Sequence, residues 1–505
     1  MKKFKFLILL AFLSVSITSF SQIDYEQLKS SGYAYINANN LMKTDEYFAS
    51  SELEGRLAGS EGFYKAVNYA SDIFKNLGLV APFSNSYYQK FFTEYNEIKP
   101  PCKLYLIISD IEKKVEGKIY HLGKDFVCRQ NTGSGTFEAP VVFVGYGIDD
   151  KETGYNDYEN VDVKGKIVLM FKQEPDWLLN FGGSPNLRFR ANLAAQKGAI
   201  AVILVSKPND KNPQKPIGSV LDGAGEHLDN LPILHVNLNV AKDFLSESGY
   251  ALKDLQTQID SSKKPVSIYL KKKIKMEIHS YYTKEKETMN VVGVLEGSDS
   301  LLKNECVVIG AHLDHVGQQA GEIYFPGAND NASGSSAVIE IAKAFVNSGI
   351  KPKRTIVFIL FSNEESGLQG SQYYTDNPLF PLNKTVAMLN LDCIGFGDSI
   401  QVGNGESVQE LWKIANKNDS LFTKMMVKRT WKDGGADATP FHKKNIPCLY
   451  FVSTNSYEHL HLTTDKPETL NKSLFEKVTK LAFLTLFDVS NGDYIREPIN
   501  GYRDN

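Results

Sequence analysis

Short apolar segments alternate with helical ones through the last third of the chain and predict an α/β sheet. From about residue 289, segments with apolar residues at helical spacing separate four apolar runs: NVVGVLEG, CVVIGAHLD, TIVFILFSNEE and TVAMLNLDCIG. Strands that are apolar along their whole length are typical of a sheet that helices cover on both faces. The fold class we predict is therefore α/β, with a mixed central β-sheet flanked by helices.

The pattern before residue 289 changes once more. Residues 25–95 have the spacing of helices with loops between them, and short β-type runs such as KLYLII and PVVFVGYGI follow from about residue 97. Proline and glycine punctuate 206–232, which predicts exposed loops. We therefore expect a β-rich domain inserted into the main domain, with its strand at 164–171 in a different sheet from the strand at 355–361.

These changes of pattern give the predicted domain boundaries. The expected order is a signal peptide (1–21), the first part of the main domain (22–125), the inserted domain (126–270), the catalytic part of the main domain (271–492) and a C-terminal tail (493–505).

The first residues have the pattern of a signal peptide. Lys2, Lys3 and Lys5 precede the apolar run LILLAFL, and small residues at 19–21 provide a cleavage site before Gln22. The apolar run is too short to span a membrane, and no later segment of the sequence reaches spanning length. We therefore expect an exported protein, periplasmic or secreted, without a membrane span.

Composition narrows the class of partner. The 505 residues are 42% hydrophobic and 23% charged, which is typical of a globular protein of two or three domains. A net charge of −3 gives no basic field, which argues against nucleic acid as the main partner. The five cysteines are few and widely spaced, which predicts buried thiols. The alternative is one disulfide bridge in an oxidising compartment. The sequence leaves the oligomeric state open.

Residue types that bind metals follow the apolar strands. The chain places them after each strand and in one polar loop near its end: His312 and Asp314, Asp330, Glu364 and Glu365, Asp392, and His459, His461 and Asp465. Each alone has an ordinary explanation, such as a helix cap or a turn. Together, nearly all of them fall at the carboxyl ends of apolar strands, where open α/β sheets bind ligands. Taken one from each of the five places, they supply His, Asp, Glu, Asp and His. Two imidazoles and three carboxylates suit two divalent ions such as zinc, with one carboxylate bridging them.

The spacing of these residues suggests their roles. Adjacent side chains of an extended chain point to opposite sides, so Glu365 can bind a metal while Glu364 faces a water beside it. A base beside a metal-activated water is the machinery of hydrolysis. Residues two apart point to the same side, so Asp314 is expected to accept a hydrogen bond from the ring nitrogen of His312 that does not bind metal.

Five motifs carry a family resemblance. In this order, GAHLDHVG, GANDNASG, NEESGLQGS, NLDCIG and HLTTD resemble the zinc aminopeptidases of peptidase family M28, and NVVGVLEG and ELEGRLAGSEG resemble the same family. The resemblance implies two Zn2+ ions held by His312, Asp330, Glu365, Asp392 and His461. It implies that Asp330 bridges the ions, that Glu364 is the general base and that Asp314 orients His312.

The resemblance also divides the ligands between the two ions. It assigns His312 and Asp392 to one zinc and Glu365 and His461 to the other, and it implies a cis peptide bond between Asp330 and Asn331. His459 stays a rival to His461.

The chain departs from the family pattern in two places. Many members have tyrosine just before the last histidine, where this chain has Leu460, and many have Ser-Asp-His where it has Ala436-Asp437-Ala438. Both departures concern contacts with the substrate rather than the metal ligands.

The segment 126–270 resembles a protease-associated (PA) domain in the runs VVFVGYGI, VDVKGKIVLMF and AAQKGAIAVILV. Its role stays open between a lid, a substrate guide, an interaction surface and a passive spacer. For the whole chain, the resemblance implies an exported dizinc aminopeptidase that hydrolyses the N-terminal bond of a peptide substrate. The alternatives are a carboxypeptidase or glutaminyl cyclase with the same metals, and a non-catalytic binding protein, against which the complete set of ligands argues.

Overall fold

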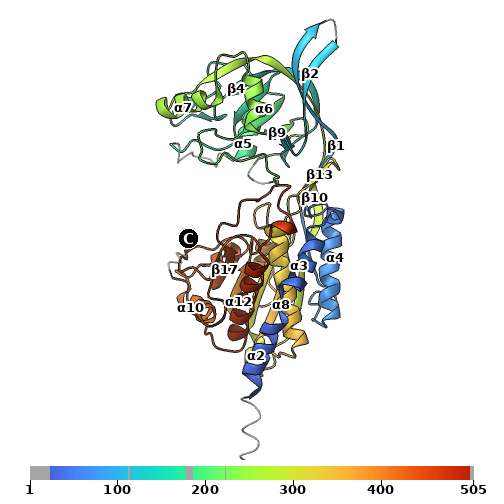
Figure 1. Ribbon diagram of the computed structural model, residues 1–505, viewed down its shortest axis with the longest axis vertical. Helices are drawn as coiled ribbons and strands as arrows, with labels where there is room; N and C mark the ends of the chain where they lie inside the picture. Colours follow the sequence, from blue (N-terminus) through green and yellow to red (C-terminus); the bar gives the residue numbers. More distant parts are fainter. Residues whose placement is uncertain (1–22, 112–113, 178–185, 222, 224, 501–505) are drawn as a thin grey trace, which may run out of the picture.

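The chain forms two lobes, which lie one above the other in Figure 1. Two long strands, β1 (Tyr88–Ile111) and β10 (Ser267–Leu295), run from one lobe into the other. This computed structural model describes residues 23–111, 114–177, 186–221, 223 and 225–500, so the predicted signal peptide lies outside the described residues. Within the described ranges, no helix is long and apolar enough to cross a membrane.

The lower lobe is a mixed sheet between helices (Figure 1). Besides β10, its strands are β11 (Cys306–His312), β14 (Thr355–Phe361), β15 (Thr385–Leu391), β16 (Ile400–Gly403) and β17 (Cys448–Ser453). Its helices are α2 (Ile23–Tyr35), α3 (Ala38–Phe48), α4 (Glu61–Asn76), α8 (Ser333–Asn347), α9 (Gln369–Asp376), α10 (Gln409–Asn418), α11 (Ala438–Lys443) and α12 (Lys472–Ser490). The strands β11, β14, β15 and β17 pair in parallel, whereas β10 and β16 are antiparallel to their neighbours. The predicted fold class is confirmed.

The strands of this sheet are apolar throughout because their alternate residues enter two different cores. In β11, Val307 and Ile309 belong to the larger core, whereas Cys306 and Val308 belong to a second one together with Phe441 of α11. Successive side chains of a strand point to opposite faces, so both faces are covered and buried. Polar side chains are therefore left to the strand ends, and that is where the candidate site lies.

The upper lobe is the inserted, β-rich domain. Besides β1 and β10, its strands are β2 (Lys114–Tyr120), β3 (Phe126–Cys128), β4 (Gly135–Val144), β5 (Asp149–Asp150), β6 (Tyr155–Asn156), β7 (Ile167–Phe171), β8 (Ala201–Val205) and β9 (Ile233–Val236). Its helices are α5 (Leu187–Gln196), α6 (Leu238–Leu245) and α7 (Leu252–Ser262). A short hairpin of β12 (Gln318–Gln319) and β13 (Ile323–Tyr324) belongs to the chain of the lower lobe and lies between the lobes (Figure 1).

One hydrogen-bonded sheet runs through both lobes, so the expected separation of the strands at 164–171 and 355–361 is wrong. The order of strands is β16-β17-β15-β11-β14-β10-β4-β7-β8-β9-β3. The end of β10, from Val291 to Leu295, pairs with β14, whereas its earlier residues pair with β4. A strand of 29 residues can leave one core and enter another without breaking its ladder of hydrogen bonds.

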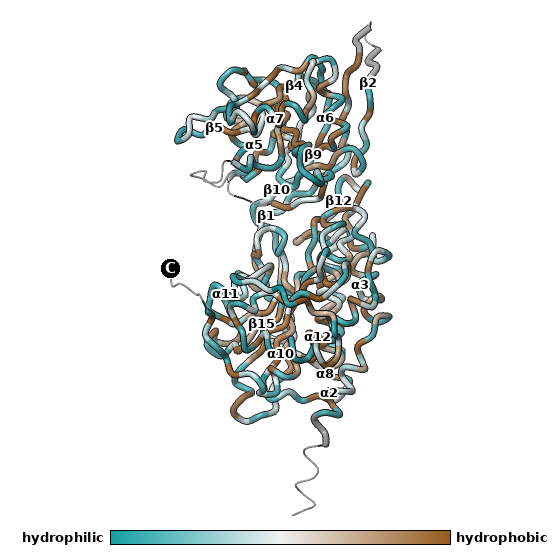
Figure 2. Tube along the Cα trace, turned by 60° about the vertical axis from the view of Figure 1, so that its left-hand side comes forward, coloured by the Kyte–Doolittle hydropathy of each residue, from teal (hydrophilic) through white to brown (hydrophobic). Residues whose placement is uncertain are grey.

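The two lobes nevertheless have separate hydrophobic cores, and apolar segments run through each of them in Figure 2. Ile98, Leu104, Ile274 and Ile278 all belong to the core of the upper lobe. By packing, the inserted domain therefore extends from about Ile98 to Ile278, beyond the predicted 126–270. The change of sequence pattern does not mark these boundaries, because β1 and β10 keep a strand pattern on both sides of them.

We expect a fragment of residues 97–280 to fold and a fragment of residues 126–270 to remain unfolded. The shorter fragment lacks the buried parts of β1 and β10, and each large aliphatic residue lost from a core costs about 2–5 kcal/mol, against a domain stability of about 5–15 kcal/mol. Urea unfolding followed by circular dichroism checks this. A cooperative transition of the shorter fragment would show that these strands are dispensable for its core.

Candidate metal centre

Four neighbouring parallel strands end at one edge of the lower sheet. β11 ends at His312 itself, and β15 ends one residue before Asp392. Glu364 and Glu365 lie in the turn after β14, and the loop after β17 carries His461. Parallel strands bring their carboxyl ends together, so residues far apart in the sequence meet at this edge.

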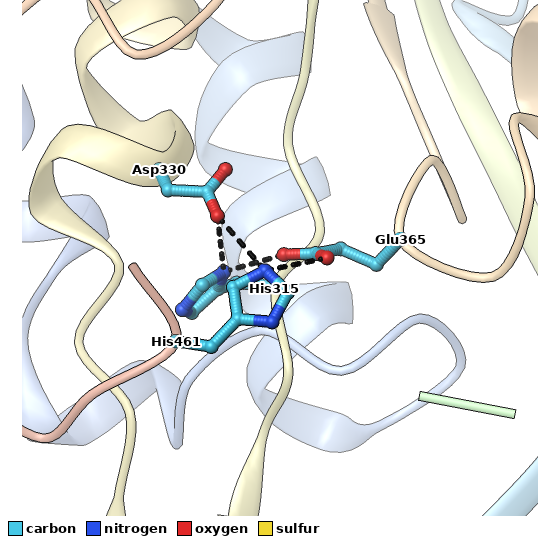
Figure 3. Close-up of side chains that lie close together, drawn as sticks. All are labelled: His315, Asp330, Glu365 and His461. Atoms are coloured by element: carbon cyan, nitrogen blue, oxygen red, sulfur yellow. Dashed lines mark hydrogen bonds and ion pairs between the residues drawn. The ribbon is translucent and has the colours of Figure 1, made fainter. Parts of the chain in front are cut away.

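Two groups of side chains in the described part of the chain could each hold a metal ion. The first is His312, Asp330 and Asp392, and the second is His315, Asp330, Glu365 and His461. Asp330 belongs to both groups. Figure 3 shows how the four side chains of the second group converge.

The two oxygens of Asp330 face different groups. His312 Nε2 lies 3.3 Å from Asp330 Oδ1 and 3.5 Å from Asp392 Oδ1. His461 Nε2 lies 3.1 Å from Asp330 Oδ2 and 2.9 Å from Glu365 Oε2. Ligand atoms about 2.0–2.1 Å from a tetrahedral zinc ion lie about 3.3 Å apart. The donors therefore fit two zinc ions in type and in spacing, with Asp330 between them.

The charges of the two groups call for cations. Burial alone would lower the pKa of His312, but the carboxylates of Glu364, Asp330 and Asp392 raise it well above its ordinary value. Burial opposes the same effect at His461, whose pKa is raised well above its ordinary value by Glu365 and Asp330. These carboxylates favour a positive charge at each imidazole, and a metal ion can supply that charge.

The predicted hydrogen bond between His312 and the carboxylate of Asp314 is absent, because the backbone carbonyl of Asp314 takes its place. Nδ1 of His312 lies 3.1 Å from the backbone carbonyl oxygen of Asp314 and 3.8 Å from its carboxylate. The prediction assumed an extended chain through Asp314, but β11 ends at His312. The carboxylate instead accepts hydrogen bonds from the backbone N–H groups of Glu364 (3.1 Å) and Glu365 (3.4 Å). Asp314 thus orients His312 with its carbonyl and fixes the glutamate turn with its carboxylate.

The two glutamates diverge from a turn rather than from an extended chain. The carbonyl of Glu364 accepts hydrogen bonds from the N–H groups of Gly367 (2.9 Å) and Leu368 (2.8 Å). Glu365 reaches the second group, whereas Glu364 belongs to neither group and its Oε2 lies 3.9 Å from His312 Nε2. Burial raises the pKa of Glu364 well above its ordinary value, and nearby carboxylates raise it further. Glu364 therefore lies beside the first group, and its raised pKa suits it to hold a proton.

Sequence reasoning missed His315. Its ring is buried, and Nδ1 lies 2.8 Å from Glu365 Oε1 and 3.7 Å from Asp330 Oδ2. His315 lies in the same GAHLDHVG motif as His312. A second histidine in a motif that supplies a metal ligand is the sequence signal that could have identified it.

Asp437 was also missed. It is fully buried, burial raises its pKa to about 7, and its charge helps to raise the pKa of Glu364. The available signal was the aspartate between Ala436 and Ala438, which is also present in the Ser-Asp-His of the family pattern.

Backbone contacts hold Asp330 in place. Asp465 accepts hydrogen bonds from the backbone N–H groups of Asn329 (2.9 Å) and Asp330 (3.1 Å). The peptide bond between Asp330 and Asn331 is cis, as the family resemblance implied. The side chain of Asn331 donates to the carbonyl of Leu391, next to Asp392 (3.0 Å). One short turn therefore ties the bridging carboxylate to a neighbouring strand end.

Arg56 gives the ELEGRLAGSEG motif a structural role. Its buried guanidinium donates to the backbone carbonyls of Leu313 (2.9 Å), Pro326 (2.8 Å) and Gly327 (3.0 Å). These carbonyls lie in the two segments that carry His312 and Asp330, so Arg56 clamps one segment to the other.

His459, the rival of His461, lies outside both groups. Its Nδ1 lies 3.0 Å from the hydroxyl of Thr464, and its ring packs edge-on against Phe396.

Comparisons with known proteins point to one family. The family described as "Peptidase family M28" matches residues 290–486, and the family described as "PA domain" matches residues 137–244. The chain is similar to "Aminopeptidase YwaD" of Bacillus subtilis, with 24% identity over 75% of this chain and 74% of that protein. It is also similar to an "Aminopeptidase" of Pseudomonas aeruginosa, with 27% identity over 73% of this chain and 60% of that protein.

Solved structures share the fold. The aminopeptidase from Aneurinibacillus sp. strain AM-1 aligns with a TM-score of 0.61 at 20% identity, over 95% of this chain and 99% of that one. BSAP, a zinc aminopeptidase from Bacillus subtilis, aligns with a TM-score of 0.61 at 18% identity, over 92% of this chain and 98% of that one. The predicted family resemblance and the predicted PA domain are confirmed.

We expect Asp330→Asn to lose both metal ions and His461→Ala to lose one. Asparagine keeps the shape of the side chain but not the charge or the second acceptor oxygen that bridging needs. Zinc per chain, measured by mass spectrometry after dialysis of folded protein, checks this, with His459→Ala as the matched control that keeps both ions. An Asp330→Asn protein that keeps one tightly bound ion would remove Asp330 from the bridging role.

Proposed function

The chain belongs to peptidase family M28, and from this premise we propose that it is an exported dizinc aminopeptidase. In this proposal it hydrolyses the N-terminal bond of peptides. His312, Asp330 and Asp392 would hold one zinc ion, and Asp330, Glu365 and His461, with His315 beside them, would hold the other. The proposed reaction needs these two groups and, beside them, a carboxylate that binds no metal, which here is Glu364.

The observation that carries the proposal is the position of Glu364 beside a shared carboxylate. Asp330 directs one oxygen to each group, and Glu364 lies 3.9 Å from His312 of the first group without belonging to either group. A non-catalytic binding protein of the same fold has no need of a partly buried carboxylate at that position, where it repels Asp437, Asp392 and Glu365.

Glu364 transfers the proton in the proposed reaction. Bound zinc would supply a Lewis acid for the scissile carbonyl and would lower the pKa of a water. Glu364 accepts the proton of the attacking water and returns it to the leaving amine. Its raised pKa lets it hold the proton between these two steps, and the carboxylate of Asp314 fixes the backbone from which Glu364 projects.

The two departures from the family pattern meet in one apolar cluster. Leu460 and Ala436 both pack against a cluster that contains Tyr450, whose hydroxyl donates to Asp392 Oδ2 over 3.4 Å. Trp431 packs against the same cluster. An apolar wall beside a metal ligand supports a preference for a peptide whose first side chain is apolar.

Two other reactions of such a metal pair are a carboxypeptidase and a glutaminyl cyclase. The names of the relatives favour the aminopeptidase. Export rests on the pattern of residues 1–21 alone, and N-terminal sequencing of the mature protein, with Gln22 expected first, tests it.

We expect a peptide with a free N-terminal leucine to be hydrolysed and its N-acetylated form to resist. The carboxylates of the centre can stabilise the charged amine of the free peptide, and a hydrogen bond to a charged group is worth about 1.5–3 kcal/mol, or about 10–100-fold in rate. Mass spectrometry of the products checks this. Release of the C-terminal residue, or cyclisation of an N-terminal glutamine without cleavage, would point to one of the other two reactions.

We expect Glu364→Gln to keep both metal ions and to lose about 10²–10⁴ in kcat, because glutamine keeps the shape but cannot accept the proton. Zinc content and kcat, measured on one preparation, check this. Loss of one zinc ion would mean that the roles of Glu364 and Glu365 must be exchanged. The matched variant Glu365→Gln is expected to lose metal from the second group.

A further inference from the structure

The inserted domain contacts a candidate metal ligand through the backbone. The N–H of Gly218 donates a hydrogen bond to the carbonyl of His461 over 2.8 Å. Gly218 lies within the part of the chain that matches the PA domain, whereas His461 lies within the part that matches the peptidase family. The bond therefore joins the two lobes at the residue whose side chain points into the second group.

His461 has a backbone conformation that needs such support. Its φ is +55°, in the left-handed region, which residues other than glycine rarely adopt. It lies in a loop outside the helices and strands, so no ladder of hydrogen bonds fixes it. A strained residue persists where its surroundings hold it. The bond from Gly218 fixes the carbonyl of this residue while Nε2 of its ring meets Asp330 and Glu365.

Apolar packing holds the loop 216–220 against the metal motif. Val220 of this loop and Val127 form a small buried cluster with Val316 and Phe325 of the lower lobe. Val316 directly follows His315. The loop is therefore fixed from below by the segment that carries the first histidines of the site.

A further clasp lies close by. The side chain of Gln319 exchanges two hydrogen bonds with the backbone of Cys128, of 2.9 and 2.8 Å. It fixes the strand β3 of the inserted domain to the hairpin β12–β13. The hydrogen bond from Gly218 is thus one of several contacts between the two lobes, together with the apolar cluster and the bonds of Gln319.

The close approach at this point requires glycine. A Cβ atom on Gly218 would lie 2.5 Å from Val316 Cγ2 and 3.2 Å from Phe325 Cδ1. The first distance is an overlap, so any side chain would push the loop 216–220 away from His461.

From these contacts we propose that the loop 216–220 of the inserted domain is a positioning element for the metal ligand His461. The inserted domain then sets how tightly the second group binds its ion, which neither a passive spacer nor a freely moving lid would do. The inference rests on the proposed function in one respect, namely that His461 binds a metal.

The test is Gly218→Ala, which introduces the overlap and disturbs the bond to His461. We expect one of the two zinc ions to bind about 10–100-fold more weakly, as happens when a partner that orients a ligand is lost. Competition with a chromophoric chelator measures both dissociation constants. Gly117→Ala is the matched control, because it adds the same methyl group to the inserted domain, where the Cβ would lie 3.1 Å from the carbonyl oxygen of Leu106, away from His461.

Two further variants separate positioning from a loss of folding. Val316→Ala removes the methyl group that the new Cβ would strike, so the double variant Gly218→Ala/Val316→Ala is expected to recover most of the lost affinity. Val220→Ala loosens the loop without an overlap and is expected to weaken the same zinc ion by a smaller factor. Unchanged zinc affinity in folded Gly218→Ala, equal weakening of both ions, or an effect on KM alone would overturn the proposal.

Hydrogen exchange of residues 457–465 tests the positioning role independently of the proposed function, because it can be measured without metal. In metal-free protein we expect faster exchange of this segment in Gly218→Ala than in Gly117→Ala, and equal rates would overturn the proposal. If the natural protein binds fewer than two zinc ions, the proposed function fails, and the exchange measurement still decides whether the loop holds His461.

Discussion

The structure depends on the concentration of negative charge at one largely buried edge of the sheet. Asp330, Glu364, Glu365, Asp392 and Asp437 lie close enough to shift one another's pKa or that of a shared histidine. Carboxylates this close cannot all stay ionised without a compensating positive charge. In the proposed dizinc centre, two divalent cations would supply that charge at two points. The fold therefore has to hold the carboxylates apart by about the width of an ion, and much of the surrounding structure serves that end.

Hydrogen bonds to the backbone do most of this holding. Asp465 and Asp314 each accept hydrogen bonds from two backbone N–H groups beside a candidate ligand. The guanidinium of Arg56 donates to backbone carbonyls rather than to the carboxylates. If Arg56 paired with Asp330 directly, its charge would compete with a metal for the bridging oxygens. Its position behind the backbone fixes the geometry and leaves that charge to the metals.

The sequence predicts the strand ends well and the local directions of side chains less well. Apolar strands that end at a common edge account for His312, Glu365 and Asp392. Asp330 instead lies in the turn before α8, and His461 lies in the loop after β17, but the structure brings all five together. The hydrogen bond predicted between the side chains of His312 and Asp314 fails because it assumed an extended chain beyond the last residue of β11. The domain boundaries are missed for a related reason. A strand pattern shows that a residue is half-buried or buried, but not which of two cores buries it, and Ile98 and Ile278 belong to the upper one.

The connection between the lobes limits what the inserted domain can do. Two strands, β1 and β10, join the lobes along one line, and a domain joined only there could turn about that line. The contact between Gly218 and His461 lies elsewhere in the chain and adds a second point of attachment, and the clasp of Gln319 and Cys128 adds a third. Rotation of the inserted domain would therefore have to break the bond to His461, so any opening of the lobes would loosen a candidate metal ligand at the same time. Motion of this domain and metal affinity are coupled by the fold itself.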